Sequence, residues 1–342
     1  MRFNKKFFVI LSLLLIMCLV TACGGDKPAT PTNQKPADKV YTLKAGHVLA
    51  SDHPYHLGLL KMAEIMAQKS NGRLKMDVFP SSQIGNERDL IEGMQMGTID
   101  VSLVSTAPLA GFVKDFLAFD LPFLFKDRAT ALKVLDGEIG QESLKQIAAN
   151  NLIGLSFWEN GYFNINNSKK AVKKPSDMNG LKIRTMENAI HMSTFKALGA
   201  NPIPMAWGEV FTALQQSAID GCTLTPTSFW TSKLQDANQK YLTVTHHVYI
   251  PAPLLMSKKT YDALPDDLKA IVKEAAMGAR DYERELSAKV DSEYMAKIKA
   301  AGVQIIEVDQ AEWQKALQPV YAEYIPSKIP QAFIDKIQAA NK

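Results

Sequence analysis

Residues 41–79 read YTLKAGHVLASDHPYHLGLLKMAEIMAQKSNGRLKMDVF, and this stretch decides the fold. Residues 41–49 predict a strand, and residues 54–70 have the apolar spacing of a helix, which Asn71-Gly72 ends. Residues 74–79 alternate apolar and polar side chains, as a half-buried strand does. The stretch therefore predicts a β-α-β unit, whose two strands are parallel because a helix crosses over between them.

The same order of elements returns later in the chain. The first unit continues with a predicted helix at 87–96 and a strand at 99–104. The second has a strand at 181–185, helices at 188–198 and 207–216, and a strand at 219–224. Two α/β lobes of related design are therefore expected, each with a largely parallel sheet covered by helices.

A short sequence similarity supports this repetition. Residues 94–100 (MQMGTID) resemble residues 214–220 (LQQSAID) in type and spacing, at the same helix-to-strand junction. The match is short, so chance is an alternative explanation. If the lobes are related, a ligand is expected in the crevice at the carboxyl ends of their strands.

Residues 265–301 predict a long charged helix. Apolar residues recur in it at helical spacing, Asp266 and Asp267 suit its start, and Gly302 suits its end. Such a helix is roughly 50 Å long at 1.5 Å per residue and is long enough to bridge two lobes. Two shorter helices that break at Gly278 are the alternative.

The chain begins with features of an exported lipoprotein. Arg2, Lys5 and Lys6 precede an apolar run at 7–20 that is too short for a membrane-spanning helix, so residues 1–22 are predicted to be a signal peptide. The sequence VTACGG at 20–25 resembles a lipobox, which predicts lipidation of Cys23. An ordinary secretory signal with a chance cysteine is the alternative. Residues 23–39 are predicted to be a flexible linker.

Charge and cysteine content argue against a nucleic-acid-binding protein and against a disulfide-bonded domain. The chain has a formal charge of +4, and removal of residues 1–22 would take away three positive charges and leave +1, so a nucleic-acid partner is not expected. Cys222 would be the only cysteine besides Cys23 in the mature chain, and no disulfide is expected in the folded domain.

Enzyme and metal signatures are missing from the sequence. It contains no G-x-S-x-G, H-E-x-x-H, P-loop or dinucleotide glycine motif, so no catalytic residue is predicted. His47, His53 and His56 are conceivable metal ligands, but no cysteine or acidic residue stands at a ligand spacing. Neither a metal nor a cofactor is expected.

The sequence GLKIRTMEN at 180–188 holds the most informative charged residue. Arg184 ends an apolar strand at its carboxyl end, where its guanidinium can hold a carboxylate with two parallel hydrogen bonds. An exposed surface arginine is the alternative, since most arginines are exposed.

Several motifs in the expected order resemble one family. They are FPSSQIGNER (79–88), FDLPFLF (119–125), GLKIR (180–184), GANPIPM (199–205), EVFTALQQ (209–216) and DG (220–221). With them the chain resembles the DctP-type solute-binding proteins of tripartite ATP-independent periplasmic (TRAP) transporters. The resemblance implies a two-lobed α/β fold like that of type II periplasmic binding proteins, with mixed sheets, flanking helices, crossing strands as a hinge and a long helix over both lobes. We expect residues 40–161 with 250–289 in lobe I and residues 162–249 with 290–342 in lobe II.

The resemblance also implies a set of ligand-binding residues. Arg184 matches the carboxylate clamp, and Trp207 matches an aromatic position against the ligand. Core packing for Trp207 and a helix-start charge for Glu87 are the alternatives. The predicted ligand-binding residues are Glu87, Ser105, Thr106, Asn160, Phe163, Arg184, Glu187, Trp207 and Leu224.

Two departures from the family pattern bear on the ligand. Phe163 stands where many members have a second arginine, and Cys222-Thr223-Leu224-Thr225 replaces a common Gln-Glu-Asn-Pro. The far end of the pocket should therefore be less polar. An acid with one main carboxylate, such as a keto, hydroxy or aromatic acid, is expected above a highly charged sugar acid.

These observations predict an extracytoplasmic solute-binding protein that is lipid-anchored on the outer face of the cytoplasmic membrane. It is expected to capture a small organic acid in an inter-lobe cleft and to deliver it to the integral-membrane permease subunits of a TRAP-type secondary transporter. A ligand-presenting module for a membrane sensor is the first alternative. An extracytoplasmic enzyme on the same fold is the second.

Overall fold

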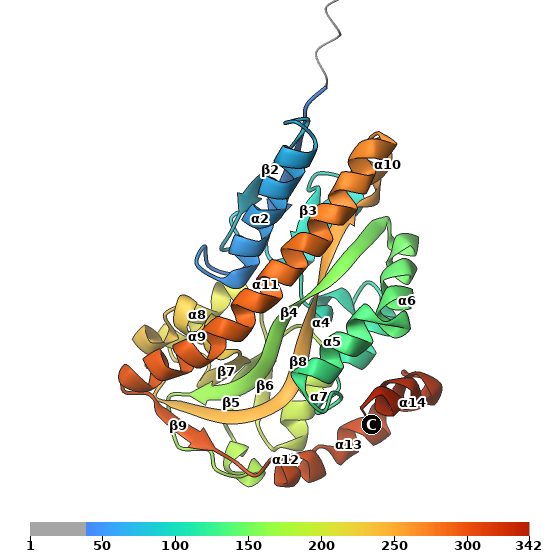
Figure 1. Ribbon diagram of the computed structural model, residues 1–342. Coiled ribbons are helices and arrows are strands. Elements are labelled where there is room, and N and C mark those ends of the chain that lie inside the picture. The colour runs from blue at the N-terminus through green and yellow to red at the C-terminus, as the bar shows by residue number, and fades with distance from the viewer. Residues whose placement is uncertain (1–38, 342) are drawn as a thin grey trace, which may run out of the picture. The chain divides into compact units, whose positions relative to one another are not determined.

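The computed structural model describes residues 39–341 (Figure 1). The predicted signal peptide at 1–22 and the lipidation site Cys23 lie outside the described residues, as does all of the predicted linker except Lys39. The chain from Val40 onward forms one compact unit. Within the described part, no helix has both the length and the apolar character needed to cross a membrane.

One mixed sheet of nine strands runs through the described residues. Eight strands lie in the order β2-β1-β3-β8-β4-β7-β5-β6, and β9 pairs with β8. The strands are β1 (Tyr41–Gly46), β2 (Leu74–Phe79), β3 (Val101–Leu103), β4 (Leu152–Asn167), β5 (Lys182–Thr185), β6 (Asn201–Pro204), β7 (Gly221–Leu224), β8 (Tyr241–Ser257) and β9 (Gln304–Glu307).

The sheet contains the same arrangement twice. Strands β2-β1-β3 are parallel to one another, and so are β6-β5-β7; each group ends against one long antiparallel strand, β8 or β4. We call residues 41–159 the first half and residues 161–249 the second half. Because β4 and β8 pair across both halves, the two predicted sheets are joined into one.

Matching hydrogen bonds show that the two halves repeat one design. The backbone N–H of Asp100 donates to the Lys44 carbonyl (3.0 Å), and Lys44 N–H donates to the Asp100 carboxylate (2.7 Å). Asp220 and Lys182 form the same pair of bonds, at 2.7 and 2.9 Å. Each aspartate thus links its strand to the neighbouring parallel strand. The similarity between residues 94–100 and 214–220 therefore marks a repeated structural unit.

Strands β4 and β8 are irregular where they pass from one half to the other. The pairing shifts register between Glu159 and Gly161, so Asn160 has no partner in the ladder. Gly161 has a φ of 107°, a conformation that side chains rarely adopt. Such a bulge turns the side chain of the extra residue, here Asn160, out of the regular alternation of the strand.

The helices cover the sheet and agree closely with the predicted ones. Helix α11 (Asp266–Ala300) contacts α2, β4 and α9, so it lies against both halves, as Figure 1 shows. The other helices are α2 (Pro54–Lys69), α3 (Glu87–Met96), α4 (Thr106–Leu109), α5 (Arg128–Asp136), α6 (Glu138–Gln146), α7 (Ala189–Ala197), α8 (Trp207–Gln215), α9 (Pro226–Thr231), α10 (Lys258–Ala263), α12 (Gln310–Ala316), α13 (Gln318–Tyr324) and α14 (Gln331–Ala340). Short 3-10 helices are η1 (Lys114–Asp120), η2 (Ile147–Asn150), η3 (Pro175–Met178) and η4 (Leu234–Ala237).

Helix α11 is continuous, so the alternative of two helices that break at Gly278 is wrong. Gly278 instead faces α2, where a Cβ atom would lie 3.2 Å from Cδ1 of Ile65. The glycine thus permits close helix packing without ending the helix, because the rest of α11 supplies buried apolar residues on one face.

The C-terminal helices touch both halves. Helix α13 contacts α7 of the second half, and α14 contacts α5 of the first half. The lobe boundaries at 161/162, 249/250 and 289/290 stay a prediction.

Gly58 on α2 offers a test of this packing. A Cβ atom there would lie 2.4 Å from the Trp158 ring. The steric overlap in Gly58→Ala should cost about 1 to 3 kcal/mol of stability. The higher helix propensity of alanine offsets up to about 1 kcal/mol of this cost. Urea unfolding measures the change. Gly278→Ala is the control, because its new methyl group meets only the flexible tip of Ile65 and should change stability less. A Gly58→Ala protein that is more stable than wild type, as helix propensity alone would make it, would contradict the packing argument.

Candidate functional site

A small internal cavity lies at the carboxyl ends of the parallel strands. Residues from both halves line it: Val48, Leu49, Tyr55, Glu87, Ser105, Asn160, Phe163, Arg184, Met186, Trp207, Leu224 and Ser228. Its volume is about 20 Å³, which is room for little more than one water molecule. We call it the Arg184 cavity. It lies where the repeated α/β design predicts a ligand site.

Arg184 is a buried cation in this cavity. Strand β5 positions it, its side chain is 2 % exposed, and its Nε–H donates to the Met205 carbonyl at 2.9 Å. The guanidinium carbon lies 5.4 Å from the Trp207 ring centre. Burial lowers the pKa of Arg184, although nearby acidic groups oppose the shift. The predicted alternative of an exposed surface arginine is therefore wrong.

The outer edge of this guanidinium is unpaired in the part of the chain that the structure describes. Among the described residues, no carboxylate forms an ion pair with Arg184, and its two terminal nitrogens make no hydrogen bond. A buried guanidinium normally requires an anionic or hydrogen-bonding partner. Its two parallel N–H groups match the two oxygens of a carboxylate.

Glu87 brings a buried negative charge to the same cavity. It is the first residue of α3, whose start is fixed by a hydrogen bond from Asn86 N–H to the Asp89 carboxylate at 2.9 Å. Glu87 Oε1 accepts a hydrogen bond from Ser105 N–H at 2.6 Å. Burial raises the pKa of Glu87, while the Ser105 bonds and the charge of Arg184 act in the opposite direction.

Seven of the nine predicted binding residues meet in the Arg184 cavity. They are Glu87, Ser105, Asn160, Phe163, Arg184, Trp207 and Leu224. Asn160 reaches the cavity from the bulge of β4, and its Oδ1 is buried without a hydrogen-bond partner among the described residues. Phe163 and Met186 form part of a small apolar cluster beside it.

The other two predicted residues lie elsewhere. Thr106 is buried, and its hydroxyl donates to Asp120 at 3.0 Å, because the chain enters α4 directly after Ser105 and turns the next side chain away. Glu187 is exposed and lines a separate surface pocket that also contains Lys328. It follows Met186, and neighbouring residues in an extended segment point in opposite directions.

Sequence reasoning missed five lining residues. They are Val48, Leu49, Tyr55, Met186 and Ser228. Val48 and Leu49 follow the end of β1, and Met186 follows the end of β5. Their position just after a strand was the available signal, since ligand sites gather there in parallel sheets.

Polar contacts join residues of the first half to residues of the second half. The Asn188 side chain donates to the Ala107 carbonyl at 3.1 Å and to the Asp120 carboxylate at 3.0 Å, and its own oxygen caps α7. Asp120 also lies 3.4 Å from His191 Nε2. Elsewhere, Asn86 Oδ1 accepts from Gly208 N–H at 3.2 Å, and His53 Nε2 lies 3.3 Å from the Ser228 hydroxyl. The two halves are therefore in a closed arrangement.

The histidines near the cavity are buried or paired. His47 Nε2 lies 3.1 Å from His56 Nδ1, and His53 Nδ1 accepts a hydrogen bond from Tyr55 N–H at 3.2 Å. Burial and the neighbouring histidines lower the pKa of His47 and of His53 to about 3. Within residues 39–341, no group of three or more His, Cys, Asp or Glu side chains is arranged to hold a metal ion.

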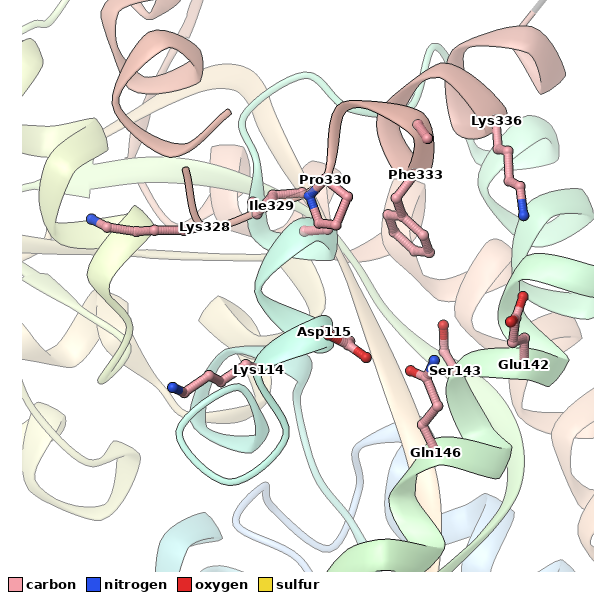
Figure 2. Close-up of a pocket in the computed structure, with 12 residues that line it drawn as sticks. Lys114, Asp115, Glu142, Ser143, Gln146, Lys328, Ile329, Pro330, Phe333 and Lys336 are labelled. Atoms are coloured by element: carbon pink, nitrogen blue, oxygen red, sulfur yellow. The ribbon is translucent and has the colours of Figure 1, made fainter. Parts of the chain in front are cut away.

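A larger surface pocket shares no lining residue with the Arg184 cavity. Figure 2 shows the side chains that line it. It has a volume of about 200 Å³ and is bordered by η1, α6 and the start of α14. Its one buried polar side chain, Ser143, already donates to the Ile139 carbonyl at 2.9 Å. Its charged side chains are all exposed and spread around it: Lys114, Asp115, Glu142, Lys328 and Lys336. The pocket thus offers no buried polar group that needs a ligand.

Comparison with known families matches this geometry. Residues 45–327 fit the family model described as bacterial extracellular solute-binding protein, family 7, or DctP. The chain belongs to this family. The predicted resemblance to DctP-type TRAP solute-binding proteins is confirmed, and so is the predicted fold class.

Three relatives show the range of the family. The C4-dicarboxylate-binding periplasmic protein DctP of Rhodobacter capsulatus is 32% identical over 305 residues, which cover 87% of this chain and 90% of the relative. A TRAP periplasmic solute-binding protein from Polaromonas sp. JS666, bound to D-erythronate, is 39% identical with a TM-score of 0.85 and covers 87% and 98% of the two chains. A TRAP periplasmic solute-binding protein from Bordetella bronchiseptica, with density assigned to pantoate in its crystal structure, is 38% identical with a TM-score of 0.85. The match covers 88% of this chain and 99% of that protein.

The buried histidines predict how stability depends on pH. The folded pKa of His53 lies below its unfolded value, so the unfolded chain binds more protons than the folded chain below about pH 6.5. The free energy of unfolding therefore decreases as the pH is lowered, by up to about 1.4 kcal/mol per pH unit. His53→Asn keeps a capping oxygen for α2 but cannot titrate. Wild type should therefore lose more stability than His53→Asn between pH 7.5 and 5 in urea unfolding.

Other titrating groups are common to both proteins. Burial and Glu159 raise the pKa of Glu283 to about 8, so Glu283 stabilises both folded proteins as the pH is lowered. Only the difference between the stability-versus-pH curves of wild type and His53→Asn is therefore compared. Parallel curves would show that His53 does not stay neutral in the folded protein.

Proposed function

We propose that this protein captures one small organic acid in the Arg184 cavity and delivers it to the membrane permease subunits of a TRAP-type secondary transporter. Membership of the solute-binding family and the position of the cavity between two repeated halves support this function. The same family consists of binding proteins, and we assign no enzymatic activity to the chain.

The observation that carries the proposal is the buried guanidinium of Arg184. It is fixed by the Met205 carbonyl and by Trp207, while its terminal nitrogens lack a partner among the described residues. A carboxylate there would neutralise the charge with two charge-assisted hydrogen bonds. The indole of Trp207 and the ring of Phe163 would cover the apolar part of the acid.

Capture requires the two halves to separate. The closed cavity of about 20 Å³ is too small for an organic acid, which must therefore enter a more open form. The crossing strands β4 and β8 are the natural hinge, because Asn160 and Gly161 already interrupt their pairing. Closure would then bring Arg184 of the second half against Glu87 and Ser105 of the first.

We also propose that the protein is exported and attached by a lipid on Cys23 to the outer face of the cytoplasmic membrane. The lipobox-like sequence at 20–25 supports this anchor. A folded domain that begins at Val40 would then be separated from the membrane by a short polar segment.

Substitution of Arg184 tests the carboxylate clamp. Arg184→Ala should weaken binding of a small acid such as D-erythronate about ten- to a hundred-fold, since a buried charged hydrogen bond contributes about 1.5 to 3 kcal/mol. Isothermal titration calorimetry gives the affinity. Arg88→Ala, which removes an exposed arginine from α3, is the control and should bind as wild type does. An affinity within a few-fold of wild type for Arg184→Ala would refute the clamp.

Substitution of Asn188 tests closure. Asn188→Asp keeps the cap of α7 but places a second carboxylate against Asp120, so the closed form should be disfavoured. We expect ligand to dissociate about ten-fold faster or more, as measured by stopped-flow tryptophan fluorescence. Asn201→Asp, at an exposed position of β6, is the matched control. Unchanged dissociation would show that this contact does not hold the halves together.

A further inference from the structure

The hydroxyl of Tyr55 is a buried polar group that lacks a partner within residues 39–341. Tyr55 is 1 % exposed and lines the Arg184 cavity, and its Oη makes no hydrogen bond with any described residue. The side chain of Ser105 lies near it but without hydrogen-bond geometry. Buried hydroxyls are almost always hydrogen-bonded, so this one indicates a missing partner in the cavity.

The ring of Tyr55 is held in place by its neighbours. It packs edge-on against His53, with ring centres 5.0 Å apart, and against His47 at 6.5 Å. Burial and nearby carboxylates raise the pKa of Tyr55 well above its usual value, so the hydroxyl keeps its proton and can donate. Tyr55 thus presents a fixed donor to the cavity.

Two acceptors line the same space. Glu87 accepts a hydrogen bond from Ser105 N–H at Oε1, and a carboxylate has further lone pairs that can accept from a ligand in the cavity. Asn160 Oδ1 is buried and also lacks a partner in the described chain. The cavity therefore combines the cationic fork of Arg184 with a separate polar group that includes the donor Tyr55 and the acceptors Glu87 and Asn160.

We propose that this donor-acceptor group selects acids that carry one carboxylate and neighbouring hydroxyl groups, and that it rejects acids with a second carboxylate. The inference rests on the proposed function, because it takes the first carboxylate to bind Arg184. A hydroxyl can accept from Tyr55 and at the same time donate to Glu87 or Asn160. A second carboxylate can only accept, so it would face the oxygens of Glu87 and Asn160 without a proton to share.

The lining also limits how many hydroxyl groups the acid carries. Val48, Leu49, Phe163 and Met186 form apolar walls that offer no hydrogen bonds to a long polyhydroxylated chain. A short hydroxy acid can form hydrogen bonds with Tyr55, Glu87 and Asn160 and leaves its remaining carbons against these walls. Tyr55 thus becomes a specificity-determining residue that the family pattern did not indicate.

Two four-carbon acids give a matched test. D-erythronate has one carboxylate and three hydroxyls, whereas succinate has two carboxylates and none. Wild type should bind D-erythronate at least about a hundred-fold more tightly than succinate in titration calorimetry, since a site built to hydrogen-bond hydroxyls rejects analogues that lack them. Equal affinities, or no binding of D-erythronate at millimolar concentration, would overturn the inference.

Tyr55→Phe and Glu87→Gln separate the contributions. Tyr55→Phe should bind D-erythronate about ten-fold more weakly, because it loses the hydrogen bond to the ligand hydroxyl. Its affinity for succinate should stay the same or rise. Its melting temperature without ligand should also stay the same or rise, because the variant no longer buries an unpaired hydroxyl. Glu87→Gln should reduce the preference for D-erythronate by improving succinate binding. Tyr321→Phe is the control, since Tyr321 donates to the Pro122 carbonyl outside the cavity.

The outcomes distinguish this inference from the proposed function. If Arg184→Ala weakens D-erythronate binding but Tyr55→Phe and Glu87→Gln leave the ratio of the two affinities unchanged, the hydroxyl selection is wrong and the clamp stands. If Arg184→Ala has no effect on an acid that binds, the proposed function itself fails.

Discussion

The pairing of β4 with β8 is the constraint on which the rest of the structure depends. These two strands run through both halves and hold the parallel groups β2-β1-β3 and β6-β5-β7 in one sheet. Because each group ends against one of them, the carboxyl ends of the parallel strands from both halves meet at one place. The bulge at Asn160 interrupts the pairing at that point and directs a polar side chain into the cavity.

The charges of the cavity follow from this meeting of the halves. Arg184 arrives from the second half and Glu87 from the first, and no ion pair joins them among the described contacts. Each is held instead by a backbone group, the Met205 carbonyl or the Ser105 N–H. Fixed charges that do not neutralise each other can recognise a ligand that carries both an anionic group and hydrogen-bond donors.

Much of this arrangement could be predicted from the sequence. The strand that ends at Arg184 and the helix that starts at Glu87 were found because local apolar patterns are strong there. Tyr55 could not be found, because a tyrosine after the proline at a helix start looks like ordinary core packing. Thr106 was predicted together with Ser105, but α4 begins at Thr106 and the Thr106 hydroxyl pairs with Asp120 outside the cavity lining. The contacts of Asn188 with the first half depend on tertiary structure alone.

The small volume of the Arg184 cavity has a thermodynamic consequence. An acid that is larger than the enclosed space binds only to molecules that are open at that moment, and the observed affinity is the intrinsic affinity scaled by the open fraction. Residues outside the cavity lining, such as Asp120, can therefore change the affinity for a ligand by shifting the equilibrium between open and closed forms. Natural variation in the ligand concentration that half-saturates such proteins can therefore arise from contacts between the two halves, while the residues that line the cavity stay the same.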